Sequence, residues 1–224
     1  MNCARVYSPP DIARPKVGAA APDPHMLLCE MEHRVKNHLQ MLAAYAHLLA
    51  KRGDLTAQDV AQDIAEKLWA VAGAHEALHA AGARGDSLAL PFLQTLCRPF
   101  KGSPHRIEVD CDAALQLPAD QLAPLGMIVS EALSNAVRHA FPRGQSGRLQ
   151  VSLAQEGREL ELVVHDDGRG LPAAAAPRSS GRTMIATLAR QLGGLAQFQN
   201  RPIGGAEVRV VFPARPSEHE AYPA

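Results

Sequence analysis

The chain lacks an excess of charge of either sign, because 23 Lys and Arg residues balance 23 Asp and Glu residues. Binding to nucleic acid without sequence preference needs a basic surface, so this balance argues against that class of partner. Cysteine is scarce as well, and none of the four cysteines has a C-x-x-C spacing. This pattern predicts reduced thiols in a cytoplasmic protein and argues against a disulfide scaffold or a zinc knuckle.

Residues 1–25 contain no apolar run long enough for a membrane span or a secretory signal, and they are rich in proline and alanine. We expect this segment and the tail 215–224 to be disordered, and we expect no membrane partner. A sensory domain needs on the order of 100 residues, more than this segment offers. The signal is therefore expected from a separate sensor protein, or from a ligand of the helices that follow.

A first amphipathic helix is predicted after this segment, with apolar residues recurring at helical spacing from Leu28 to Leu49. His33 lies roughly 200° around this helix from both Met31 and Val35. A helix that buries those two residues must hold the imidazole toward water. We interpret His33 as a side chain placed for chemistry with an arriving group.

A second helix is predicted for residues 55–81, because the apolar pattern stops at Gly53 and Asp54 and then resumes. Two helices with a tight connection make an antiparallel hairpin. The apolar stripe of this hairpin is too wide for one partner helix to cover, so we expect a homodimer with a four-helix bundle. Residues 26–82 form this module, and residues 81–87, with two glycines, are the expected hinge.

Polar residues gather on one face of a further helix, Leu122–Phe141. Glu131, Asn135 and His139 follow each other at intervals of four, and Arg138 lies beside them. Oxygen ligands on one helical face suit Mg²⁺, which prefers a few protein oxygens together with water and phosphates.

A strand-like run, Glu159–His165, ends in the sequence DDGRGLP. A carboxylate at a strand end, here Asp166, can accept a hydrogen bond from the exocyclic amine of a base. Glycines such as Gly168 and Gly170 let the backbone approach a flat ligand. Gly181 precedes another predicted helix, whose free backbone N–H groups suit a phosphate. Further strands are predicted at residues 106–110, 148–154, 195–199 and 207–212.

Together these motifs resemble those of the bacterial sensor histidine kinases, in the subgroup with an H-R-x-K-N phosphoacceptor box. The resemblance covers residues 26–213 and rests on HRVKN (33–37), EALSNAVRHAF (131–141), DDGRGLP (166–172) and ARQLGG (189–194). A related subgroup has a tryptophan-x-glutamate motif near the adenine site. That motif is not matched, because the only tryptophan, Trp69, lies in the second helix.

The resemblance implies an α+β fold, in which the dimeric hairpin precedes a two-layer α/β sandwich of the Bergerat ATPase type at residues 87–214. It implies that ATP and Mg²⁺ bind there, with Asn135 and Glu131 at the metal and Asp166 at adenine. The remaining residues implied at the nucleotide pocket and its lid are Arg138, His139, Gly168, Gly170 and Gly181. The lid, residues 173–180, is short and rich in alanine, which is a departure from the family pattern.

For the hairpin, the resemblance implies that His33 takes the γ-phosphoryl group of ATP and passes it to an aspartate in the receiver domain of a response regulator. Glu32 is the carboxylate next to this histidine and can help remove the ring proton. Asn37, one turn beyond His33, matches the position at which related kinases place water for dephosphorylation of the regulator.

Three other functions stay open. The same architecture can relay phosphoryl groups without ATP, although Asn135 and Asp166 argue against this. An anti-sigma-type serine kinase uses the same ATPase fold, but should lack the hairpin. A zinc peptidase is the least favoured: residues 75–79 read HEALH, which matches H-E-x-x-H, but Gly85 stands where a third ligand is needed.

Overall fold

The computed structural model describes residues 24–50, 55–81, 86–142, 145–172 and 180–215. Two long helices, α1 (Pro24–Ala50) and α2 (Ala57–Ala81), come first and confirm the predicted hairpin. The predicted disordered segments and the predicted hinge lie mostly outside the described residues, but α1 begins at Pro24, two residues inside the first segment predicted to be disordered. None of the described helices has the length and hydropathy needed to cross a bilayer.

The hairpin helices begin and pack as their sequences indicate. Thr56 and Asp59 form a capping box at the start of α2, since each side chain accepts a hydrogen bond from the other residue's backbone N–H, at 3.1 and 2.9 Å. Burial along α1 decreases toward its N-terminus: Leu49 is 1% exposed, whereas Met31 is 61% exposed. The expected burial of Met31 and Val35 is therefore not achieved within one chain.

The second module is built on a five-stranded sheet with the order β2-β4-β5-β7-β6, in which only β2 and β4 are parallel. Its strands match the five predicted ones and are β2 (Arg106–Cys111), β4 (Arg148–Glu156), β5 (Glu159–Asp166), β6 (Leu195–Asn200) and β7 (Ala206–Pro213). Alternate residues of β5 are buried, namely Leu160, Leu162, Val164 and Asp166. This period of two places the Asp166 carboxylate on the inner face of the sheet.

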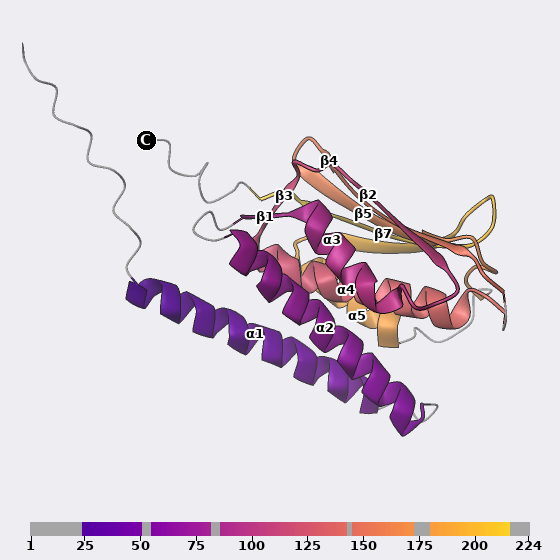
Figure 1. Ribbon diagram of the computed structural model, residues 1–224, viewed down its shortest axis with the longest axis horizontal. Coiled ribbons are helices and arrows are strands. Elements are labelled where there is room, and N and C mark those ends of the chain that lie inside the picture. Colours follow the sequence, from indigo (N-terminus) through magenta and orange to yellow (C-terminus); the bar gives the residue numbers. More distant parts are fainter. Residues whose placement is uncertain (1–23, 51–54, 82–85, 143–144, 173–179, 216–224) are drawn as a thin grey trace, which may run out of the picture.

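Two predicted helices cover that inner face, α4 (Ala119–His139) and α5 (Ser180–Gln191). Figure 1 shows the sheet on one side, α3, α4 and α5 beneath it, and then α2 and α1. Most of α4 is buried because the sheet lies on one side of it and α2 on the other. The predicted two-layer sandwich is thus confirmed, with the hairpin packed as a third layer on α4.

Sequence patterns did not reveal four short elements near the start of the second module. The helix α3 (Ala89–Cys97) continues into a 3-10 helix, η2 (Arg98–Phe100), and β1 (Asp86–Leu88) pairs with β3 (Gln116–Pro118). Two three-residue strands are too short to show any periodicity.

Candidate functional site

His33 lies on the exposed side of α1, as predicted. The Nδ2 atom of Asn37, one turn later, lies 3.4 Å from Nδ1 of His33, which is a long hydrogen bond. This contact involves Nδ1 and not Nε2, the other ring nitrogen. Glu32 is exposed beside His33, and among the described residues no hydrogen bond joins the two. The structure therefore presents an imidazole to solvent with an amide at one of its nitrogens.

A cavity of about 530 Å³ lies between α4, α5 and the C-terminal end of β5. This size is in the range of small-molecule pockets. Of the predicted nucleotide residues, it is lined by Asn135, His139, Asp166 and Gly170. Residues of α4, of β5 with the turn after it, of α5, of β6 and of β7 thus meet at one cavity.

Asp166 is 4% exposed and is held by the backbone. Its Oδ1 atom accepts hydrogen bonds from the N–H groups of Gly168, at 2.9 Å, and Ala206, at 3.2 Å. Among the described residues no hydrogen bond to Oδ2 is found. The carboxylate is therefore fixed in place while one oxygen stays available to accept from a ligand amine in the cavity.

The glycines near Asp166 are needed by the packing of the protein itself. A Cβ atom on Gly168 would lie 2.3 Å from the carbonyl oxygen of Ala140, at the end of α4. Gly170 has a φ of +79°, and a Cβ there would lie 2.7 Å from Oδ1 of Asn200. These glycines bring the turn after β5 against α4 and β6, and so shape one wall of the cavity.

The polar face of α4 divides between two surroundings. Asn135 and His139 line the cavity, whereas neither Glu131 nor Arg138 is among its lining residues. Of the two residues predicted to hold Mg²⁺, only Asn135 faces the cavity here, and its amide oxygen fits a hard cation. The place at the nucleotide pocket that the resemblance implies for Arg138 is likewise not found in this arrangement.

Glu131 is instead joined to the hairpin. Its Oε2 atom lies 2.9 Å from Nζ of Lys67 in α2 and accepts a hydrogen bond from the Tyr45 hydroxyl of α1, at 3.2 Å. Its Oε1 atom accepts from Nδ2 of Asn135, at 3.0 Å. Burial by itself raises the pKa of Glu131, but the Lys67 charge and these hydrogen bonds hold the pKa below its usual range.

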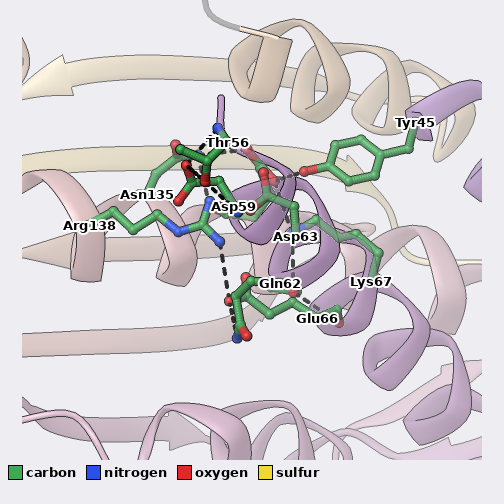
Figure 2. Close-up of polar contacts among 11 residues, drawn as sticks. Tyr45, Thr56, Asp59, Gln62, Asp63, Glu66, Lys67, Asn135 and Arg138 are labelled. Atoms are coloured by element: carbon green, nitrogen blue, oxygen red, sulfur yellow. Dashed lines mark hydrogen bonds and ion pairs between the residues drawn. The ribbon is translucent and has the colours of Figure 1, made fainter. Parts of the chain in front are cut away.

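Arg138 forms a second link to α2. Figure 2 shows its guanidinium group meeting Asp63 and Glu66 of that helix. Burial raises the pKa of the Asp63 carboxyl despite the opposing charge of Arg138. These ion pairs and the Lys67 pair lie in the contact between α2 and α4, which is therefore polar and buried.

The HEALH segment does not form a metal site. No group of three or more His, Cys, Asp or Glu side chains in the described parts of the chain is arranged to hold a metal ion. His75 instead lies within α2 and contacts His38 of α1, with 3.1 Å between Nε2 and Nδ1. Burial, followed by the charges of His75 and Arg34, lowers the pKa of His38 to about 4.

Sequence reasoning missed several residues at the site. In the sequence, Lys67 looks like an ordinary lysine and Tyr45 like a core aromatic residue. Their contacts with Glu131 exist only because the hairpin packs on α4. Gly205 packs so closely on Asp166 that a Cβ would lie 1.9 Å from its carbonyl oxygen. The pair of glycines at 204 and 205, both with positive φ, was the available signal.

Comparison with known proteins agrees with this geometry. The family model for HWE histidine kinases matches residues 30–113, and the model for the histidine kinase-like ATPase domain matches residues 106–205. These matches confirm the resemblance to histidine kinases that the sequence motifs predicted.

Among similar proteins, the sensor histidine kinase PdtaS of Mycolicibacterium smegmatis is 30% identical over 82% of this chain and 39% of its own length. The blue-light-activated histidine kinase 2 of Erythrobacter litoralis is 29% identical over 65% of this chain and 44% of its own length. A solved structure of the Erythrobacter litoralis EL346 blue-light-activated histidine kinase covers 88% of this chain and 61% of that chain, with a TM-score of 0.65 and 22% identity.

The fold and the site define an ATPase module of the histidine kinase type with a helical hairpin before it. The chain belongs to the histidine kinases. It spans less than half the length of these two curated relatives.

Proposed function

We propose that the chain is an ATP-dependent histidine autokinase that phosphorylates His33 and passes the phosphoryl group to an aspartate of a response regulator. The observation that carries this proposal is the pairing of an exposed imidazole on α1 with a cavity lined by Asn135 and Asp166. The names of the relatives and the family matches support the same activity.

The reaction is a phosphoryl transfer, in which positioning and charge neutralisation supply most of the catalysis. Oδ2 of Asp166 would accept a hydrogen bond from the adenine amine. The amide oxygen of Asn135 would hold Mg²⁺, which would supply neutralisation of the phosphate charge. A ring nitrogen of His33 forms a bond to the γ-phosphorus while the bond from that phosphorus to the β,γ-bridging oxygen breaks, and ADP leaves. The ring proton passes to Glu32 or to water.

The autokinase needs a rearrangement between its two modules. His33 is not among the residues that line the cavity, and α4 is packed against α2. The ATPase module must therefore leave this docked position before the γ-phosphate can meet the imidazole in line.

A homodimer is part of this proposal. Four large apolar side chains of the hairpin are at least 42% exposed and can meet a second copy, namely Met31, Val35, Leu39 and Leu68. Such a concentration of exposed apolar surface on two helices is suited to a four-helix bundle with a second copy. Light scattering on the purified protein measures the mass of the assembly, and a monomer at micromolar concentration contradicts this part of the proposal.

The autokinase is tested by incubating the protein with γ-labelled ATP and Mg²⁺. We expect a label that is stable to alkali and labile to acid, which is the signature of a phosphohistidine. His33→Ala removes the acceptor, and Asn135→Ala removes the magnesium ligand, so neither variant should become labelled.

His47→Ala is the matched control, because His47 is an exposed histidine on the same helix. This variant should be labelled as well as the wild type. A label that persists on His33→Ala overturns the assignment of the acceptor.

A further inference from the structure

A fully buried lysine joins the hairpin to the ATPase module. Lys67 of α2 is 0% exposed, and its ammonium group lies 2.9 Å from Oε2 of Glu131 and donates to Oγ of Ser130, at 3.3 Å. It also lies over the Tyr45 ring, 5.4 Å from the centroid. A buried ammonium group is tolerated only when it is paired and hydrogen-bonded, so Lys67 requires the carboxylate of α4.

The Glu131 carboxylate is fully engaged by these contacts. Lys67 and Tyr45, both from the hairpin, occupy Oε2, and Asn135 occupies Oε1. Nδ2 of Asn135 is also bonded to the backbone oxygen of Glu131, at 2.8 Å. The position of the Asn135 amide, which faces the cavity, is thus set by a residue that the hairpin holds.

The start of α5 adds a second constraint at the same point. A Cβ atom on Gly181 would lie 2.0 Å from Oε1 of Glu131 and 3.0 Å from Nδ2 of Asn135. The helix that follows residues 173–179 therefore begins directly on Glu131 and Asn135. Any movement of the Glu131 carboxylate toward the cavity must displace α5 or break the contact with Lys67.

We propose that Lys67 is a positioning residue of the nucleotide site: it draws the Glu131 carboxylate to the hairpin and away from magnesium, so that docking of α2 on α4 competes with Mg²⁺-nucleotide binding. This inference rests on the proposed function. Lys67 acts through Glu131 and not by contact with the nucleotide. When α2 leaves α4, Glu131 becomes free to join Asn135 as an oxygen ligand.

A second set of contacts supports the same docked arrangement without touching Lys67. Arg138 of α4 pairs with Asp63 and Glu66 of α2. Asp63 does not line the cavity and makes no contact with Asn135 or Glu131 among the described hydrogen bonds and ion pairs. The charges of Glu131 and Lys67 act on Asp63, but weakening this pair loosens docking from a different side and replaces neither partner of the Lys67–Glu131 ion pair.

The fluorescence of Trp69 can report whether α2 is docked on the ATPase module. Trp69 is the only tryptophan, and it lines a small groove together with Arg98 and Pro99 of η2 in the ATPase module. When α2 leaves this module, the indole loses those neighbours and becomes more exposed to water. Its fluorescence emission should then shift to longer wavelength, which can be measured without nucleotide.

The test compares Lys67→Met, Asp63→Asn and wild type in the full chain, with Lys101→Met as the control at an exposed lysine. Calorimetry measures the dissociation constant for a non-hydrolysable ATP analogue with Mg²⁺. We expect tighter binding by about tenfold or more in the first two variants. We also expect their Trp69 emission to be red-shifted without nucleotide, and wild-type emission to shift in the same direction when the analogue binds.

The outcomes separate this inference from the proposed function. Unchanged affinity in both variants, with the wild type binding normally, overturns the role of Lys67 alone. Weaker binding in Lys67→Met but not in Asp63→Asn also overturns it, since Lys67 would then assist phosphate binding directly. If no form of the protein binds the analogue, the autokinase and this inference both fail. Asp63→Asn keeps the test available if Lys67→Met does not fold, as judged by circular dichroism.

Discussion

The Asp166→Asn substitution tests adenine recognition with little disturbance of the fold. The Oδ1 atom accepts two backbone hydrogen bonds, and an amide oxygen can accept both. The other atom of the side chain changes from an acceptor to an NH₂ donor, which cannot accept from the adenine amine. Loss of a hydrogen bond to a charged acceptor costs about 1.5–3 kcal/mol, which corresponds to a roughly 10- to 150-fold higher dissociation constant for ATP.

Calorimetric titration with the non-hydrolysable ATP analogue measures this change, and thermal unfolding checks the fold. Asp167→Asn is the matched control, because Asp167 is the next carboxylate, is exposed and accepts from the N–H of Arg148, at 2.7 Å. It should bind the analogue as the wild type does. If Asp166→Asn binds with wild-type affinity while its melting temperature is unchanged, Oδ2 does not recognise the adenine amine and the reasoning is refuted.

Two further predictions concern stability. Gly168→Ala should lower the free energy of unfolding, measured in urea, by about 1–3 kcal/mol, because the new Cβ would lie 2.3 Å from a backbone oxygen. Gly102→Ala is the control: a Cβ there has nothing within 4 Å, so the free energy of unfolding should change by less than about 0.5 kcal/mol. Equal effects of the two substitutions contradict the packing argument. The pKa of His38 is lowered to about 4, so between about pH 6.5 and 4 the unfolded chain binds a proton that the folded chain does not. The free energy of unfolding should therefore decrease as the pH is lowered through this window, by up to roughly 1.4 kcal/mol per pH unit. In urea titrations at pH 7 and pH 5, His38→Gln should reduce this pH dependence, and the control His47→Gln should not.

The long helices and the strands of the five-stranded sheet could be predicted from the sequence because each has a period of its own. Leu160, Leu162 and Val164 alternate along β5, and the long helices repeat their apolar residues at helical spacing. The packing of α2 on α4 could not be predicted in the same way. Beside its apolar residues, this contact contains Lys67 and Asp63, two polar residues of α2 that pair with Glu131 and Arg138 of α4. Polar residues at such positions normally read as a solvated face.

The polar stripe of α4 shows where prediction of the site stops. At about 100° per residue, Arg138 and Glu131 lie at one edge of the stripe, and Asn135 and His139 lie roughly 40° and 80° around the helix from Glu131. A stripe this narrow looks like one surface in the sequence, and it predicts that all four side chains serve one ligand. The structure places its two edges in different surroundings: the edge with Asn135 and His139 faces the cavity, and the edge with Glu131 and Arg138 faces α2. Because the side chains of Asn135 and Glu131 are hydrogen-bonded across that boundary, at 3.0 Å, a change on the hairpin side can reach the cavity through this contact. The narrowness of the stripe is thus what allows the position of the hairpin to act on the nucleotide site.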